Sequence, residues 1–274
     1  MQRQRIVVLG AGYVGRAVAA SAAQAGHEVW AVRRAAVTEA GGGVQWCRGD
    51  VTTGHIEGLP AALDVVVLTI APGASGNYDT VYPPAAAAAL VLARATGAAR
   101  VVYTSSTGVY GGRDGVWVAE ASPRRGAGAG NDALRRAEDV LLESGFPMHV
   151  LRVAGIYGPG RDPRSRFRDA QALAQRGEYW VNLAHRDDIV AAVRHVSGGA
   201  AAQRILNVSD GTPAQAAEIC RWLARADGLD GAALHFTNDA TPARNDQRVS
   251  NAALVSTGWR ASYPSFREGF STGC

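Results

Sequence analysis

The sequence predicts an α/β fold in which helices cover both faces of a largely parallel sheet, and three observations lead to this prediction. Short apolar runs rich in β-branched residues recur at 5–10, 27–34, 43–50, 64–70, 99–106 and 148–155. Helical patterns separate several of them, at 13–26, 81–97 and 131–145. The runs are apolar on both faces, as in strands buried between two helical layers. The 274 residues suffice for one complete core with a small lobe attached.

The second half of the chain continues the alternation less regularly. It predicts a loop, a helix, a strand, a second helix and a short helix with a tail, at 156–166, 185–199, 204–210, 211–228 and 248–270. The first of these helices can begin at Asp187 or Asp188. The second has Thr212 as its N-cap, Pro213 at its first position and Gly228 at its end.

Composition narrows the function classes. The apolar share of 47% and the charged share of 19% are those of an ordinary soluble protein. The net charge of +4 is scattered, with no basic block interleaved with aromatic residues, so nucleic acid is not expected as a partner. All 28 basic side chains are Arg, which excludes Schiff-base chemistry on a lysine.

Cysteine usage and hydropathy indicate a cytoplasmic setting. Cys47, Cys220 and Cys274 form no CxxC pair, and their odd number argues against a disulfide framework. The apolar run near the N-terminus is broken by glycines and is expected to be a strand rather than a signal peptide. No apolar stretch is long enough to predict a membrane span.

A glycine motif between the first strand and the first helix indicates a nucleotide site. Gly10, Gly12 and Gly15 form G-x-G-x-x-G. The first glycine makes a tight turn, the second lets backbone N–H groups approach a diphosphate, and the third lets the helix pack on the strand. The helix N-terminus adds partial positive charge, so we predict dinucleotide binding there.

With this motif, the predicted α/β fold becomes more specific: a Rossmann-like doubly wound parallel sheet with a small C-terminal substrate lobe. We predict a dinucleotide-binding domain over 1–154, to which 182–212 return, and a substrate lobe made of 155–181 and 213–274.

The end of the second strand favours NADP(H) over NAD(H). NAD-binding sites usually carry an acid there for the ribose 2′-hydroxyl. This chain has Arg33 and Arg34 instead, with no acid before Glu39. A guanidinium can hold a 2′-phosphate through two parallel hydrogen bonds.

Motifs along nearly the whole chain resemble the extended and atypical short-chain dehydrogenase/reductases, including the NAD-dependent epimerase/dehydratase group. The stretches that carry the resemblance are GAGYVG, GDVT at 49–52, LTIAP at 68–72, YTSSTGVYGG at 103–112, LRVAGIYGPGR at 151–161, HRDDIVAAV at 185–193 and LNVSDGTP at 206–213. The last of these, with the C-terminal segment, is most similar to a bacterial branch of small atypical members.

The resemblance implies roles for individual residues. Asp50 would accept a hydrogen bond from the adenine amino group, with Val51 beside the ring. Ser106 would orient the substrate carbonyl, although a hydroxyl at a strand end often serves only the local backbone. The other cofactor contacts implied are Tyr13, Val14, Ile70, Ala71, Pro72, Ser105, Gly155 and Ile156.

The family's Tyr-x-x-x-Lys pair is absent from the helix at 131–145. Alignment on Ala137 and Glu138 puts Gly130 and Leu134 at the two positions, and a shift by one puts Asn131 and Arg135 there. None of these can replace a phenol whose pKa is lowered by a nearby lysine.

Three explanations for the missing acid stay open. Another group can supply the proton: Tyr110, Tyr157, Tyr78, Tyr82 or His185 can reach the pocket from neighbouring loops. Tyr110 and Tyr157 are our catalytic candidates besides Ser106, although both also suit aromatic packing in turns. The substrate can need little acid help, or the chain can have lost catalysis. Residues expected to face the substrate are Tyr78, Tyr82, Thr107, Asn131, Arg161 and His185, and His185 can equally cap the helix that follows it.

The sequence therefore predicts an NADP(H)-dependent reductase or dehydrogenase of a small organic molecule, with a non-standard proton donor and no metal. A noncatalytic NADP(H)-binding regulator and a redox-neutral epimerase, isomerase or cyclase are the alternatives. A homodimer stays open.

Overall fold

The computed structural model describes residues 3–35, 41–73, 77–162, 164, 177–228, 236 and 245–271. Its centre is an eight-stranded sheet in the order β12-β8-β6-β5-β1-β2-β3-β4. The strands are β1 (Arg5–Leu9), β2 (Glu28–Arg33), β3 (Val44–Asp50), β4 (His55–Ile56), β5 (Val65–Leu68), β6 (Arg100–Ser106), β8 (Met148–Val153) and β12 (Ile205–Val208). All but β4 run parallel to their neighbours. The predicted α/β class and doubly wound sheet are confirmed.

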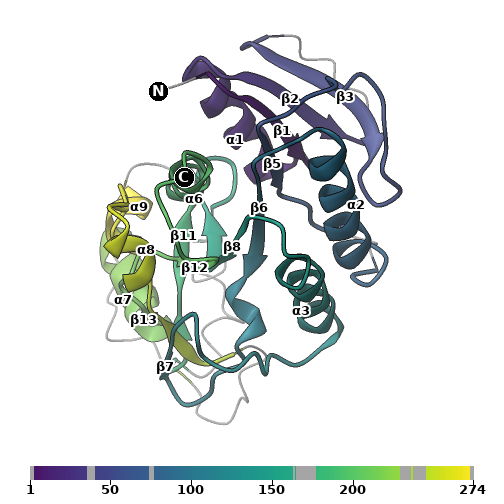
Figure 1. The fold of residues 1–274 in the computed structure, drawn as a ribbon. Coiled ribbons are helices and arrows are strands. Elements are labelled where there is room, and N and C mark those ends of the chain that lie inside the picture. The colour runs from purple at the N-terminus through teal and green to yellow at the C-terminus, as the bar shows by residue number, and fades with distance from the viewer. Residues whose placement is uncertain are drawn as a thin grey trace.

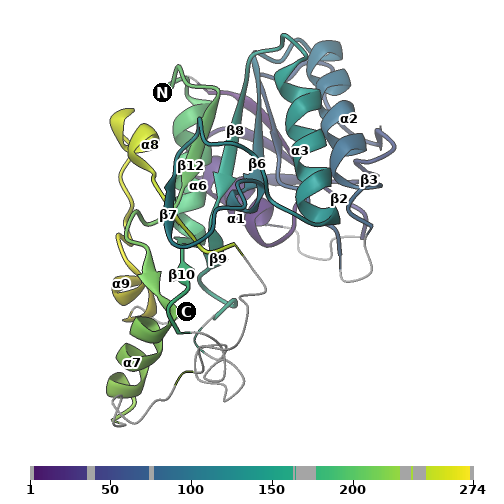
Figure 2. The ribbon, with the colours of Figure 1, turned by 90° about the horizontal axis from the view of Figure 1, so that it is seen from below.

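Two pairs of helices cover the sheet. Figures 1 and 2 show α2 (Tyr82–Ala95) and α3 (Ala129–Leu142) together on one face, with α1 (Tyr13–Gln24) and α6 (Arg186–Ser197) on the other. Each face has its own apolar core, because successive strand side chains point alternately to the two sides. The alanine run of α2 keeps that helix close to the sheet and to α3.

The chain changes direction across the sheet between β1 and β5. From β1 it moves outward through β2 and β3, and it then returns to β5 and proceeds through β6, β8 and β12. In open parallel sheets such a switch point leaves a crevice at the carboxyl ends of the strands, where ligands bind.

Smaller elements form a lobe beside the carboxyl ends of the strands (Figure 1). The strand pairs are β9 (Gly155–Tyr157) with β11 (Leu183–His185), β10 (Trp180–Val181) with β13 (Ala214–Gln215), and β7 (Val116–Val118) with β14 (Gln247–Val249). Three helices, α7 (Ala216–Ala226), α8 (Ala252–Ser256) and α9 (Phe266–Ser271), complete the described part. Tyr157, Ile219, Phe266 and Phe270 belong to a third apolar core here, whereas Leu254 of α8 packs into the core of the large sheet.

Several sequence expectations need correction. α7 begins at Ala216 rather than beside Thr212 and Pro213, because Ala214 and Gln215 pair with β10 as a strand. The Thr212 hydroxyl instead donates to the Pro264 carbonyl at 2.7 Å. Part of the loop predicted at 156–166 lies in β9, and β7 was not predicted. Among the described residues, no helix is both long and apolar enough to cross a membrane.

Candidate cofactor and substrate site

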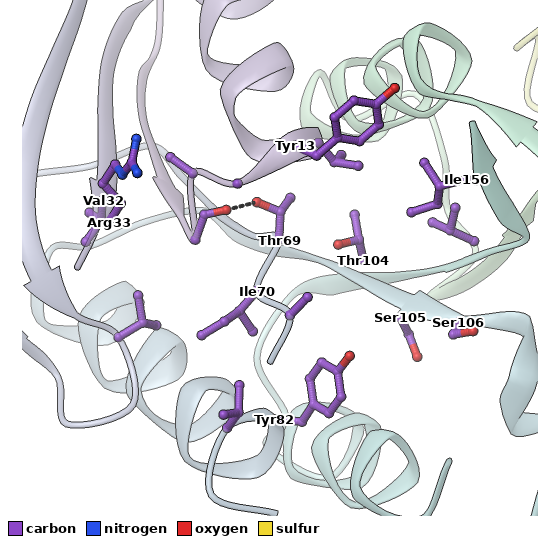
Figure 3. A pocket seen from close by; sticks show the side chains of 18 of the residues that line it. Tyr13, Val32, Arg33, Thr69, Ile70, Tyr82, Thr104, Ser105, Ser106 and Ile156 are labelled. Carbon is purple, nitrogen blue, oxygen red and sulfur yellow. Dashed lines mark hydrogen bonds between the residues drawn. The ribbon is translucent and has the colours of Figure 1, made fainter. Parts of the chain in front are cut away.

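The glycine turn after β1 is built as its spacing predicts. Gly10 has φ +89°, and a Cβ there would lie 2.9 Å from the Ile70 Cα. A Cβ on Gly15 would lie 2.4 Å from both the Gly10 oxygen and the Thr69 Oγ1, so only glycine lets α1 approach the strand. The Thr69 hydroxyl donates to the Gly10 carbonyl at 2.9 Å and braces the turn (Figure 3). No atom lies within 4 Å of a Cβ built on Gly12, which leaves its backbone open toward a ligand.

A cleft of about 610 Å³ extends from this turn along the carboxyl ends of the strands. Most residues predicted for the cofactor line it: Gly10, Gly12, Tyr13, Val14, Arg33, Arg34, Asp50, Val51, Ile70, Ala71, Ser105, Gly155 and Ile156. Gly15 lies behind the turn, and Pro72 is not among the lining residues. The cleft also contains Ser106, Tyr82 and Arg161, which the sequence assigned to catalysis or substrate.

Two arginines and a carboxylate line the cleft beside the ends of β2 and β3. Arg33, at the end of β2, and the exposed Arg34 line it together with Asp50 and Val51. The Asp50 carboxylate accepts hydrogen bonds from the Thr52 hydroxyl at 2.6 Å and the Thr52 N–H at 2.9 Å. These bonds, with the charge of Arg34, lower the pKa of Asp50, so it is an ionised acceptor. Glu39 lies outside the described residues.

Arg161 belongs to the wall of the cofactor cleft. Its guanidinium lies 5.8 Å from the centre of the Tyr13 ring, and that of Arg186 lies 5.3 Å from the same ring. Tyr13 is the residue after Gly12, so this cluster stands beside the opening where the glycine turn exposes its backbone. The position suits an anionic group of a dinucleotide at least as well as a substrate.

A second cleft of about 360 Å³ adjoins the first and shares Ser106, Ala154 and Gly155 with it. It contains the predicted substrate residues Thr107 and Asn131, and no charged side chain is among its lining residues in the described part of the chain. The clefts therefore meet at the end of β6.

Amide side chains hold the walls of this second cleft. Gln247 accepts a hydrogen bond from the Gly112 N–H at 2.7 Å and donates to the Thr107 carbonyl at 2.9 Å. Asn245 donates to the Gly108 carbonyl at 2.9 Å. The loop after Ser106 is thus fixed by residues more than a hundred positions away, a contact that local patterns in the sequence do not reveal.

Ser106 lies where the two clefts meet, as the family resemblance predicts. It ends β6 and caps a 3₁₀ turn at Thr107–Val109, where its Oγ accepts a hydrogen bond from the Gly108 N–H at 3.1 Å. Its hydroxyl hydrogen is not used in that bond, so it can donate to a substrate oxygen. Ser105 also lines the cofactor cleft, but its hydroxyl donates to Glu138 at 2.7 Å.

Each of the two registers puts one residue of α3 on a cleft. In the first register Leu134, at the lysine position, lines the cofactor cleft. In the shifted register Asn131, at the tyrosine position, lines the second cleft, while Arg135 pairs with the Gly126 carbonyl and Asp132. Neither register provides a phenol with a lysine beside it.

Four residues predicted for catalysis or substrate line neither cleft: Tyr78, Tyr110, Tyr157 and His185. Tyr110 is buried, donates a 2.6 Å hydrogen bond to Asn207, and lies under the Arg152 guanidinium. Tyr157 is buried with its ring edge-on to His185 and Phe270, 5.1 Å and 5.4 Å away between centres. Both therefore have the packing role that the sequence left open, and neither is placed for catalysis.

His185 is the N-cap of α6, so that helix begins at the residue after it rather than at Asp187 or Asp188. Its Nδ1 accepts a hydrogen bond from the Asp187 N–H at 3.2 Å. Burial lowers the pKa of His185, which is consistent with a neutral, accepting ring. Its capping role replaces the predicted substrate contact.

Sequence reasoning missed a buried ionic network beneath β6. Glu138 of α3 is 0% exposed and Arg152 of β8 is 1% exposed. The guanidinium of Arg152 donates two bonds to the Glu138 carboxylate, at 3.0 and 2.7 Å. Arg124 adds a third cation contact at 3.2 Å. A charged residue in the middle of an apolar strand, as in MHVLRV, is the one signal that could have indicated it.

The fold and the glycine turn together define a dinucleotide-binding protein. The chain belongs to the NAD(P)H-binding family, whose sequence profile matches residues 10–178. The predicted family resemblance is confirmed: the matching structures include NAD-dependent epimerase/dehydratase-type members of the extended short-chain dehydrogenase/reductases.

The chain is similar to several individual proteins. Protein YeeZ of Escherichia coli K12 is 37% identical over 131 residues, a match that spans about half of each chain, 47% in both cases. A Methylobacillus flagellatus structure described as a candidate NAD-dependent epimerase/dehydratase is 26% identical, with TM-score 0.79, over 99% of this chain and 97% of that one. WbmG of Bordetella bronchiseptica, solved in complex with NAD, has TM-score 0.80 at 16% identity over 98% and 92% of the chains, and shows the fold alone.

Proposed function

We propose that the protein is an NADP(H)-dependent reductase or dehydrogenase of a small, uncharged organic substrate such as a carbonyl, imine or conjugated acceptor. The observation that carries the proposal is the meeting of two clefts at Ser106. One has the glycine turn and two arginines at its far end, and the other has no charged lining residue in the described part of the chain.

The residues fit a nicotinamide dinucleotide. The open backbone at Gly12 and the N-terminus of α1 suit the diphosphate, and Arg33 and Arg34 suit a 2′-phosphate. Gly155 lines both clefts, and Ile156 lines the cofactor cleft next to it. When bound, the cofactor supplies a hydride donor or acceptor.

Ser106 orients the substrate in this proposal. A carbonyl oxygen in the second cleft accepts the Ser106 hydrogen, which polarises the carbonyl and brings its carbon toward the cofactor cleft. The neutral lining disfavours an anionic substrate, because its charge would lose water without gaining a counter-charge.

The decisive experiment has two stages. Calorimetry first measures the dissociation constants of NADPH and NADH, and a screen of carbonyl, imine and enone compounds then follows the nicotinamide absorbance. We expect tighter binding of NADPH and substrate-dependent loss of its absorbance. Binding without turnover of any compound would favour a noncatalytic regulator instead.

Two alternatives have specific support. The absence of a tyrosine and a lysine at Gly130 and Leu134 favours a noncatalytic NADP(H)-binding regulator. The structural likeness to epimerase/dehydratase proteins favours a redox-neutral reaction in the same clefts. Product analysis distinguishes the redox-neutral reaction from a reductase, because the substrate would be converted while the NADPH absorbance stays constant.

A further inference from the structure

Two tyrosines line the cofactor cleft, and they lie on opposite sides of it (Figure 3). Tyr13 stands at the start of α1 with its ring between the guanidiniums of Arg161 and Arg186. Tyr82 is the first residue of α2, and its hydroxyl points toward the end of β6. Only Tyr82 lies on the side of α3, where the family's acid and base would stand.

A neighbouring ring fills the space that the family's tyrosine leaves empty. A Cβ built on Gly130 would lie 3.3 Å from Tyr78 Cε1 and 3.4 Å from Tyr78 Cζ. Tyr78 in turn stacks on Tyr82, with ring centres 6.2 Å apart and planes 20° apart. Tyr82 and Leu134 both line the cofactor cleft, whereas Tyr78 lies outside it, against Gly130.

A third phenol, that of Tyr103, belongs to the apolar core against which Tyr82 packs. Tyr103 of β6 is 0% exposed, and its hydroxyl has no hydrogen-bond partner of normal geometry among the described residues. Burial raises the pKa of Tyr103 well above its usual range; nearby Tyr82 and Glu138 raise it further, and the Ser105 hydroxyl lowers it. Such a buried, unsatisfied donor is costly unless it acquires a partner during function.

We propose that Tyr82 is the proton donor of this enzyme and that Tyr103 is a positioning residue whose hydroxyl stabilises the Tyr82 oxygen when it loses its proton. This inference rests on the proposed function, because it names the acid for the reductase reaction. Tyr82 thereby takes the role of the absent tyrosine from a different helix.

The step balances for a carbonyl substrate. A hydride transferred from reduced dinucleotide to the carbonyl carbon forms a C–H bond, and the π electron pair moves to the oxygen. That oxygen takes the phenolic proton, so the substrate O–H bond forms as the Tyr82 O–H bond breaks. The dinucleotide is oxidised and the substrate is reduced. The phenolate accepts a hydrogen bond from Tyr103 and regains a proton from water after the product leaves.

The surroundings of Tyr82 favour the direction of reduction. Burial, with Tyr78 beside it, raises the pKa of Tyr82 to about 12, so the phenol keeps its proton near neutrality. An alkoxide is a stronger base than this phenolate, and it therefore takes the proton readily. The ionisable side chains around Tyr82 are Tyr78, whose ring stacks on it, and Tyr103 of β6 in the same apolar core, with Glu138 of α3 near Tyr103. Oxidation would need a phenolate that is scarce at neutral pH.

Carbon-13 NMR tests the proposal without a substrate. The protein, with its 8 tyrosines labelled at the ζ carbon, is titrated with base in the presence and absence of NADP⁺. We expect the positive nicotinamide ring to lower the pKa of one phenol, and Tyr82→Phe to remove that signal. Tyr263→Phe, which deletes a hydroxyl outside both clefts, should leave it in place. A shifting signal that survives Tyr82→Phe would overturn the proposal.

Turnover of any compound found active in the screen gives the second test. Tyr82→Phe should lower kcat by at least about 100-fold with little change in the NADPH dissociation constant. Tyr103→Phe should lower kcat less and raise the pH at which the reverse, oxidative rate appears. A Tyr82→Phe enzyme within about 3-fold of the wild type would refute the donor role. Absence of dinucleotide binding would defeat the proposed function as well, so the two failures are distinguishable.

Discussion

Replacing Arg33 and Arg34 together by alanine tests the cofactor assignment at the adenosine end of the cleft. Both side chains line the cleft at the end of β2, and neither is paired with a carboxylate within the described part of the chain. A bound 2′-phosphate would therefore gain guanidinium contacts without breaking an existing ion pair.

The size of the effect follows from exposure. A hydrogen bond to a charged group contributes about 1.5–3 kcal/mol, and solvent screening places these half-buried and exposed arginines at the lower end. Two such contacts give about 3 kcal/mol, which corresponds to ~100-fold weaker binding of NADPH. NADH has no 2′-phosphate, so its dissociation constant should change by less than about 3-fold.

Calorimetric titration of NADPH and NADH into the wild type and the double variant measures these dissociation constants. At higher salt, the difference in NADPH affinity between the two proteins should become smaller. Arg248→Ala is a matched control, because that guanidinium contacts Trp117 and Trp180 away from the cofactor cleft. Equal losses for NADPH and NADH would show that the two arginines do not read the phosphate.

Three further predictions concern packing and charge. Gly15→Ala places a Cβ 2.4 Å from the Gly10 oxygen, so we expect a loss of about 1–3 kcal/mol in stability and weaker dinucleotide binding, measured by urea unfolding and calorimetry. Glu138→Ala leaves the buried guanidinium of Arg152 with an uncompensated charge and should cost about 3–5 kcal/mol in urea unfolding. Burial raises the pKa of Asp210 from 3.8 to about 8. The folded state therefore binds more protons than the unfolded state between these values, and unfolding free energy should fall as pH rises through that window, by at most about 1.4 kcal/mol per pH unit.

Matched variants decide these cases. Gly41→Ala, whose new Cβ meets no atom within 4 Å, should be nearly neutral, and an equal loss there would remove the steric argument for Gly15. The double variant Glu138→Leu with Arg152→Met should be more stable than Glu138→Ala, and the reverse order would contradict the unpaired-charge explanation. Asp210→Asn should make the free energy of unfolding depend less on pH between about 4 and 8. An unchanged slope would show that other groups cause the pH dependence.

Local patterns in the sequence sufficed for the sheet and for the glycine turn, because each depends on residues adjacent in the chain. Gly10, Gly12 and Gly15 act within one strand-turn-helix unit, and Arg33 and Arg34 stand at the end of the next strand. The predicted start of α7 was wrong because it depends on a strand that is distant in the chain. Pro213 resembles a first helical residue, but the following two residues pair with β10, more than thirty positions earlier.

The roles of the tyrosines could not be separated from sequence for the same reason. Tyr110 and Tyr157 lie in turns that are close in sequence to residues lining the clefts. Contacts with Asn207 of β12 and Phe270 of α9 nevertheless bury them. Tyr82 was one of several equivalent candidates until α3 was placed beside it. The decisive information is burial, and burial depends on segments distant in the chain.

The bonds from Gln247 to Gly112 and Thr107 have a consequence for how the protein matures. During synthesis the nucleotide-binding half leaves the ribosome long before residue 247 is available. Until then the turn beyond Ser106 lacks these two hydrogen bonds, whereas the glycine turn and the Thr69 hydroxyl that braces it are already present. The second cleft therefore becomes ordered later than the glycine turn.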